Sequence, residues 1–195
     1  MFPYCNEKGE TVYEVVRFIP KNFVARHTCP TGKIVYNLGG DPKKCSCPKI
    51  TPMLFGLPEL LAADPRRTVY LPEGELKKQR LEDLGLVSTC FGFGAGKSDK
   101  VNNVSVLKDR PVVILTDNDD PGRAHGQKVA KQLYGVAASI KVLELPDLPE
   151  KGDIIDWLDA GGTVDELEAL AAKCPLWEPP EEASEKKKGK RSGPC

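Results

Sequence analysis

The sequence has no long hydrophobic run, no targeting segment at its start and no excess of charge of either sign. No apolar stretch in the 195 residues approaches the ~20 residues that a membrane-spanning helix needs. The opening MFPYCNEKGE lacks the basic start and apolar core of a secretory signal peptide. Because 28 basic side chains balance 28 acidic ones, a generally basic, histone-like nucleic-acid binder is excluded. We therefore expect a cytoplasmic protein with no membrane association.

What is present is the composition of a globular chain whose charge is unevenly distributed. The sequence is 40% hydrophobic and 29% charged, which suffices for the core of one medium domain with a small appendage. Residues 1–58 carry eight basic and four acidic side chains, whereas residues 59–177 carry 15 basic and 20 acidic ones. A basic arm beside an acidic body indicates, weakly, phosphate handling next to metal binding.

Seven cysteines, an odd number, without a signal peptide indicate reduced thiols. Of these, Cys29, Cys45 and Cys47 cluster along the chain, and His27 lies close to the first. Four such residues could hold a zinc ion, but the C-x-C spacing is tighter than the C-x(2–4)-C of structural zinc sites. We therefore expect ordinary loop or core cysteines, and we do not expect zinc as a cofactor.

The secondary-structure pattern changes along the chain. Strands are expected first, at 11–18, 23–26 and 34–37, and a loop rich in proline, lysine and cysteine follows over 41–52. Further strands are then expected at 68–71, 86–90, 111–116 and 139–145, and helices at 58–63, 76–84, 121–134, 154–160 and 164–172. This order predicts an α/β fold with a mainly parallel central sheet flanked by helices, preceded by a small β-rich subdomain.

Three regions are expected on this basis. Residues 1–58 form the basic, β-rich N-terminal subdomain and residues 59–177 form the α/β domain. Residues 178–195 are polar, contain proline and have no hydrophobic periodicity, so we expect a disordered tail.

Acidic residues follow three of the expected strands. Glu73 follows the expected strand at 68–71, Asp117 and Asp119 follow PVVILT at 111–116, and Asp153 follows the strand at 139–145. Ligands of open α/β sheets gather at the carboxyl ends of strands, so these side chains should meet at one edge. Asp117 and Asp119, two residues apart, would point the same way from an extended chain, and Mg²⁺ (or Mn²⁺) prefers such carboxylates together with phosphate oxygens. The alternative is that D-N-D-D-P-G is only a turn and helix cap.

Four short segments of the sequence occur in an order that resembles a known domain. VYLPEGE, GFGAGK, ILTDNDDPG and LPEKGDIIDWL occur in the order and spacing of a Toprim domain, the fold shared by DNA primases, topoisomerases and related nucleases. FPYCNEKGETVYEVVRFIPKNF also resembles the segment before Toprim in phage primase–helicases. The similarity to these proteins and to bacterial primases covers about residues 3–177.

This resemblance implies a biochemical function. Primases join ribonucleoside triphosphates into RNA primers on a single-stranded DNA template during DNA replication, by metal-dependent nucleotidyl transfer. It also implies a replicative helicase or a separate zinc-binding domain as partners, and the cytoplasm of a bacterial or phage-infected cell as the place of action.

The resemblance assigns roles to individual residues. Glu73 matches the Toprim glutamate of acid/base chemistry, and Asp117, Asp119 and Asp153 match acidic positions that bind the metal. The residues expected to contact nucleotide phosphates or nucleic acid are Arg17 and Lys21 in the upstream segment, Lys97 in the glycine-rich loop, and Arg123, for which a solvated helix position is the alternative.

One position departs from the primase pattern. Primases commonly write E-G-x-x-D, and the residue at the place of that aspartate is Lys77. Helical spacing puts Lys77 on the face of Glu73, so it could pair with that glutamate and occupy a metal subsite. Two alternatives to primer synthesis therefore stay open: a metal-dependent Toprim nuclease, and a non-catalytic module that binds nucleic acid.

Overall fold

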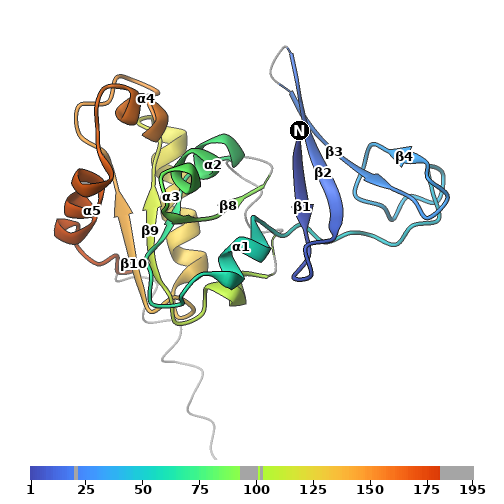
Figure 1. Cartoon of the computed structure of the whole chain (residues 1–195), viewed down its shortest axis with the longest axis horizontal. Coiled ribbons are helices and arrows are strands. Elements are labelled where there is room, and N and C mark those ends of the chain that lie inside the picture. Colours follow the sequence, from blue (N-terminus) through green and yellow to red (C-terminus); the bar gives the residue numbers. More distant parts are fainter. Residues whose placement is uncertain (20–21, 93–100, 102, 181–195) are drawn as a thin grey trace, which may run out of the picture.

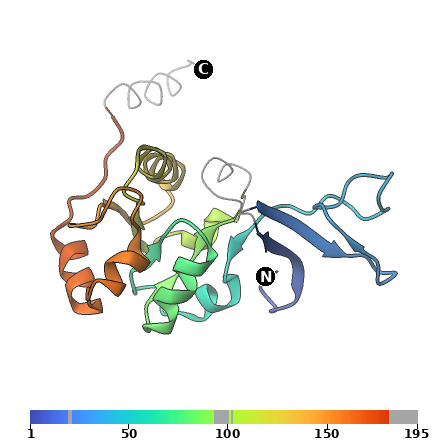
Figure 2. The same cartoon turned by 90° about the horizontal axis from the view of Figure 1, so that it is seen from above.

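Two four-stranded β-sheets lie side by side in the computed structural model, which describes residues 1–19, 22–92, 101 and 103–180 (Figure 1). The first is antiparallel, in the order β1-β2-β3-β4. Its strands are β1 (Phe2–Cys5), β2 (Thr11–Phe18), β3 (Asn22–Thr28) and β4 (Ile34–Val35). Seen from above, this sheet extends away from the rest of the molecule (Figure 2).

The second sheet is parallel throughout, in the order β10-β9-β6-β7. Its strands are β6 (Val69–Leu71), β7 (Val87–Ser88), β9 (Pro111–Leu115) and β10 (Ser139–Leu143). The helices are α1 (Leu57–Ala62), α2 (Glu75–Asp83), α3 (Asp120–Leu133), α4 (Ile154–Asp159) and α5 (Val164–Lys173), with a 3-10 turn η2 at Val104–Leu107. The predicted α/β class, with a mainly parallel sheet behind an antiparallel one, is confirmed.

Helices cover both faces of the parallel sheet because successive strand residues point to opposite sides. On β9, Val112 and Ile114 pack with α1 and α3, whereas Val113 and Leu115 pack with α2, α4 and α5. All four side chains are buried, which explains why PVVIL reads as a continuous apolar run. In the described part of the chain no helix is long and apolar enough to cross a membrane.

The expected strand at 86–90 is divided in two. Val87–Ser88 pairs with β6 in parallel, whereas Cys90–Phe91 forms β8 and pairs antiparallel with β5 (Leu54–Phe55). Thr89 makes the transition, since its amide donates to the Tyr70 carbonyl and its hydroxyl to the Phe55 carbonyl at 2.8 Å. Hydrophobic pattern alone does not reveal such a change of partner.

A buried seam joins the antiparallel sheet to β5 and β8. Tyr4 stacks on Tyr13 with ring centroids 4.5 Å apart and packs against Phe55. Its hydroxyl donates to Glu75 Oε1 at 2.7 Å. Burial raises the pKa of Tyr4 far above its usual value, so the hydroxyl remains a proton donor. The two sheets are therefore fixed to each other at the base of the space between them.

Candidate functional site at the junction of the two sheets

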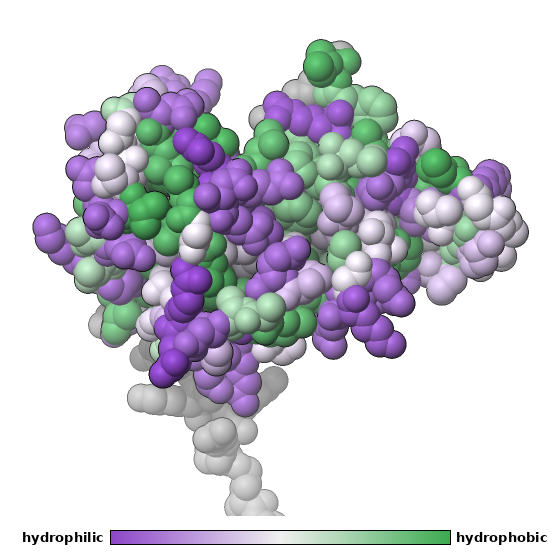
Figure 3. Space-filling model, viewed as in Figure 1, coloured by the Kyte–Doolittle hydropathy of each residue, from purple (hydrophilic) through white to green (hydrophobic). Residues whose placement is uncertain are grey.

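A cleft of 470 Å³ opens between the antiparallel sheet and the carboxyl ends of the parallel strands, and it corresponds to the hollow at the top of Figure 3. The antiparallel sheet contributes Phe2, Arg17 and Phe23. The α/β part contributes mainly charged residues, namely Glu73, Glu75, Lys77, Asp117, Asp119, Lys151 and Asp153. The expected gathering of acidic residues at one edge of the sheet is present in this cleft.

Glycine backbone geometry brings the first acidic residue to the edge. Glu73 lies between β6 and α2, and Gly74 begins the helix at a φ of 102°, a conformation that other residues rarely adopt. Nothing lies within 4 Å of the position of a Cβ on Gly74, so the backbone turn and not crowding requires glycine.

Asp119 has a structural duty as the N-cap of α3. Its Oδ1 accepts from the Gly122 amide at 2.7 Å. A Cβ on Gly122 would lie 2.7 Å from the Asp117 carbonyl oxygen and 3.0 Å from Asp119 Oδ1, so only glycine permits this close approach. The helix-cap interpretation of D-N-D-D-P-G therefore holds for one oxygen of Asp119, and the same turn places Asp117 and Asp119 in the cleft.

Asp153 is likewise the N-cap of a helix. Its Oδ1 accepts from the Ile155 amide at 2.7 Å, within a capping box completed by Asp156. Its Oδ2 lies 3.1 Å from Lys77 Nζ. Each oxygen of Asp153 thus has a partner on the protein.

Lys77 occupies the middle of the acidic group. Its side chain is only 13% exposed, and its ammonium donates to both carboxylate oxygens of Asp117, at 2.6 Å for Oδ2, as well as pairing with Asp153. Besides the pairing with Glu73 that helical spacing allows, Lys77 therefore has two acidic partners at the sheet edge, Asp117 and Asp153. Burial raises the pKa of Asp117, and Lys77 opposes this shift without cancelling it.

The donor chemistry of this group suits Mg²⁺, which prefers carboxylate oxygens. As the side chains stand, Lys77 occupies both oxygens of Asp117. The described acidic residues do not bring three ligand atoms together within 4.8 Å. An ion bound at Asp117 would therefore have to displace the Lys77 ammonium, and Glu73 and Asp119 line the same cleft.

The predicted phosphate-binding residues have different positions. Arg17 lines the cleft, with its guanidinium 5.8 Å from the centre of the Phe23 ring. Arg123 does not line it and pairs with Asp120 at 2.9 Å and Asn118 at 3.1 Å. Lys21 and Lys97 lie outside the described residues.

Sequence reasoning missed Lys151 as a lining residue of the cleft. Its amide donates to the Asn118 carbonyl at 2.9 Å, and the Asn118 amide donates to Gly152 at 2.8 Å. These bonds fix the loop before α4 against the turn after β9. The signal was available, since Lys151 stands two residues before Asp153 in LPEKGD.

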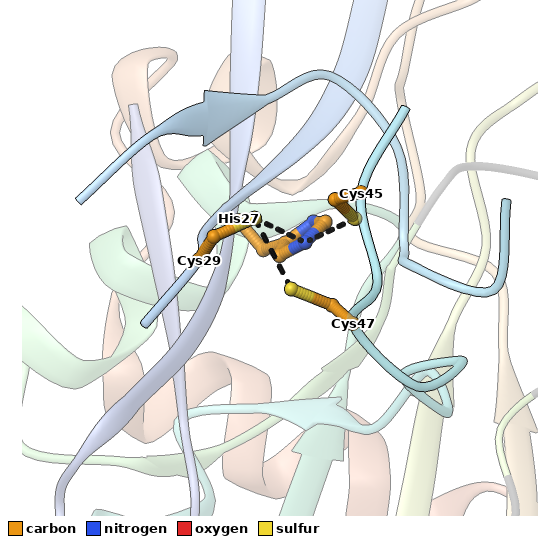
Figure 4. A group of neighbouring side chains, drawn as sticks. All are labelled: His27, Cys29, Cys45 and Cys47. Carbon is orange, nitrogen blue, oxygen red and sulfur yellow. Dashed lines mark hydrogen bonds between the residues drawn. The ribbon is translucent and has the colours of Figure 1, made fainter. Parts of the chain in front are cut away.

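A second polar cluster lies on the antiparallel sheet, away from the cleft. His27, Cys29, Cys45 and Cys47 place one ligand atom each within 4.8 Å of the others (Figure 4). This finding counts against the expectation that zinc has no part in the protein. His27 and Cys29 lie in and directly after β3, where residues two apart face the same way, and the loop after β4 brings Cys45 and Cys47 to them. Hydrogen bonding to Cys29 raises the pKa of Cys47 to about 12.

No protein-family model and no curated protein matches the sequence. Solved structures do match, and the class that they define is the catalytic core of DNA primases. Sequence identities are 15–20%, so the likeness concerns the fold alone. At that level the predicted resemblance to primases is confirmed.

Three of these structures illustrate the match. The Aquifex aeolicus primase, with its zinc-binding and RNA polymerase domains, has a TM-score of 0.62 and 20% identity, covering 90% of this chain and 40% of that one. A chain in the structure of the bacteriophage T7 lagging-strand DNA polymerase interacting with primase domains of two gp4 subunits has a TM-score of 0.58 and 18% identity. The match covers 90% of this chain and 78% of that one. The DnaG primase catalytic domain bound to ssDNA has a TM-score of 0.53 and 15% identity, and the match covers 90% of this chain and 58% of that one. The chain thus spans 40–78% of these solved chains.

Proposed function

We propose that this chain is a Toprim module of the primase type that joins ribonucleotides into an RNA primer on single-stranded DNA. The observation that carries the proposal is the cleft in which Arg17 of one sheet faces Glu73, Asp117 and Asp119 of the other. It is supported by the likeness to primase cores, one of them bound to ssDNA and one in a complex with an RNA/DNA hybrid and dTTP.

The residues of the cleft divide into two roles. Arg17 and Lys151 bind the phosphates of the incoming triphosphate or the template. Glu73, Asp117 and Asp119 would hold Mg²⁺ or Mn²⁺, and the ion would supply charge neutralisation for the triphosphate. Lys77 would then release Asp117 and keep its partner Asp153. The rest of the catalytic effect is positioning and electrostatic stabilisation by the fixed walls.

The division of the chain and its surroundings follow from the same proposal. Residues 1–58 act as the basic arm that grips phosphates, and residues 59–177 as the metal-binding domain. A replicative helicase or a separate zinc-binding domain that reads the template is the expected partner, in the cytoplasm of a bacterial or phage-infected cell.

Primer synthesis can be tested directly. The chain is incubated with a single-stranded template, labelled ribonucleotides and Mg²⁺ or Mn²⁺, and Asp117→Asn is compared with Asp120→Asn. Asp120 is the matched control because it lies in the same turn, with a side chain that is 96% exposed. Oligoribonucleotides from the wild type and Asp120→Asn but not from Asp117→Asn support the proposal. Their absence, even with a primase zinc-binding domain supplied, refutes it, and cleavage of the template lost in Asp117→Asn would favour the nuclease.

The second candidate function is a non-catalytic module that binds nucleic acid, and the ion pairs of Lys77 favour it. An ammonium that already neutralises Asp117 and Asp153 lowers the attraction of the site for a divalent cation. Calorimetric titration with Mg²⁺ separates the two functions. Binding at millimolar Mg²⁺ that is lost in Asp117→Asn supports the enzyme, and absence of binding together with retained affinity for single-stranded DNA supports the module.

A further inference from the structure

We propose that His27, Cys29, Cys45 and Cys47 form a structural zinc site built into the antiparallel sheet. This site is separate from the acidic cleft and does not depend on the function proposed for it. Three thiolates and one imidazole are a common donor set of structural zinc, and four protein ligands leave no open position for substrate. The role inferred for the metal is therefore to hold the chain in place and not to react.

Two of the separations between ligand atoms equal those of a tetrahedron around zinc, and a third is shorter. With Zn–S near 2.3 Å and Zn–N near 2.0 Å, neighbouring ligand atoms should be roughly 3.5–3.8 Å apart. His27 Nε2 lies 3.7 Å from Cys29 Sγ and 3.5 Å from Cys45 Sγ. The Sγ atoms of Cys29 and Cys47 are 3.1 Å apart, so that edge widens by about 0.7 Å when zinc enters.

The imidazole of His27 is oriented for metal binding through Nε2. Its other nitrogen, Nδ1, lies 2.9 Å from the backbone carbonyl oxygen of Asn37. A ligating histidine almost always donates its second ring N–H to such an acceptor, which fixes the tautomer and directs the free nitrogen at the metal. His27 is only 3% exposed, so this orientation is also held by packing.

Two segments of the chain deliver the four ligands in pairs. His27 lies near the end of β3 and Cys29 just after it, and both are buried. Cys45 and Cys47 come from the loop that follows β4, and Figure 4 shows them approaching from the opposite side. In each pair the ligands are two residues apart. His27 and Cys29 lie in and directly after a strand, where such residues face the same way, and Cys45 and Cys47 lie in the bent loop that approaches them.

The backbone around the cluster forms closed turns even though it has no regular secondary structure. The Cys29 amide donates to Lys33, the Gly40 amide to Cys47 and the Cys45 amide to Asp41, at 2.8, 2.9 and 3.0 Å. Residues 36–53 contain no helix or strand. A loop of this length with little apolar core needs another source of stability, and a bound metal supplies it.

A disulfide between Cys29 and Cys47 is the competing explanation for the proximity of the sulfurs. Their separation of 3.1 Å exceeds the ~2.05 Å of an S–S bond, and all six described cysteines are free. A disulfide would also leave unexplained why Cys45 and His27 Nε2 converge on the same point, 3.5 Å apart. Zinc accounts for all four residues at once.

The experiment measures metal content in the full chain, purified with a reducing agent and without added chelator. The wild type is compared with Cys45→Ser and with the control Cys5→Ser, a half-buried thiol of the same sheet outside the cluster. Elemental analysis should find about one zinc per chain in the wild type and in Cys5→Ser. Loss of an outer hydrogen-bond partner of a ligand weakens metal binding by roughly 10–100-fold. Cys45→Ser removes a ligand itself, so its affinity for zinc should fall by more than this.

Spectroscopy on the wild type keeps the test valid if Cys45→Ser does not fold. Co²⁺ in place of zinc should give intense visible bands of a tetrahedral site and thiolate-to-metal charge transfer, and removal of the metal by a chelator should lower the thermal midpoint until zinc is restored. A folded wild-type chain that takes up no zinc or cobalt overturns the proposal. So does a Cys29–Cys47 disulfide found by mass spectrometry in the reduced preparation, or an octahedral cobalt spectrum without charge transfer.

Discussion

Replacing Lys77 by methionine tests the electrostatics of the acidic cleft more sharply than any change to a carboxylate. Methionine keeps much of the length of the side chain and removes the ammonium. Asp117 and Asp153 then face each other without a counter-charge, in a place where both side chains are only 22–23% exposed. The variant should be less stable than the wild type without metal, and more responsive to Mg²⁺.

The size of the effect follows from the contacts. At an effective dielectric constant of ~20, the pair between Lys77 Nζ and Asp153 Oδ2 at 3.1 Å has a Coulomb energy of about 5 kcal/mol. Desolvation of a largely buried ammonium offsets most of this. We therefore expect Lys77→Met to lower the free energy of unfolding by about 2 kcal/mol in the absence of divalent ions.

Urea unfolding with and without Mg²⁺ is the assay. Mg²⁺ at a hundred times its Kd stabilises a folded chain by about 2.7 kcal/mol, and this gain should be larger in Lys77→Met because the ion no longer competes with an ammonium. The control is Arg80→Met on the same helix, where the arginine is 43% exposed and 3.9 Å from its partner Asp159; its stability should hardly change. If Lys77→Met matches the wild type without metal and Mg²⁺ shifts both equally, Lys77 does not act as the internal cation of the site.

Three further predictions concern the walls of the cleft and the core. Gly122→Ala should lower the free energy of unfolding by about 1–3 kcal/mol, because the new Cβ would meet the Asp117 carbonyl at 2.7 Å; an unchanged urea midpoint would contradict the close approach. Tyr4→Phe leaves a buried Glu75 oxygen without its 2.7 Å donor, so stability should fall by about 1–3 kcal/mol, and a neutral result would mean that water replaces the hydroxyl. Burial lowers the pKa of His125 below 6.5, so the unfolded chain binds a proton that the folded chain resists, and stability should fall as the pH drops below 6.5. His125→Gln should show less of this loss between about pH 7.5 and pH 5.5, and equal pH dependence would rule out His125 as a source.

Much of the fold was predictable because the parallel strands carry unambiguous hydrophobic patterns. Pro111–Leu115 and Ser139–Leu143 are strands as expected, and α3 begins and ends within about one residue of the prediction. The strand Phe2–Cys5 was missed because Pro3 argues against a strand, and here Pro3 is exposed on the edge of the sheet, the place where proline is tolerated.

The positions of the acidic residues could be predicted because these residues follow strands. The partners of Lys77 could not, because they lie after other strands, at the edge of the sheet. Glu73, Asp117, Asp119 and Asp153 share one cleft because parallel strands end together. The partners of Lys77 depend on which way α2 leans over that edge, and helical spacing within α2 carries no information about it. The His27 cluster was underestimated for a similar reason, since its two pairs of ligands meet only when the loop after β4 folds back on β3.

The seam under the cleft limits how the two walls could move relative to each other. Tyr13 belongs to the fixed base, whereas Arg17 lies four residues further along the same strand, about 13 Å away. β2 pairs with β1 and β3, so this end of the sheet would turn together about the stacked tyrosines. A rotation of about 10° there would carry Arg17 by about 2 Å towards or away from the opposite wall. Such a rotation would change the opening of the cleft from the arginine side, while Asp119 and Asp153 keep the positions that their helix caps give them.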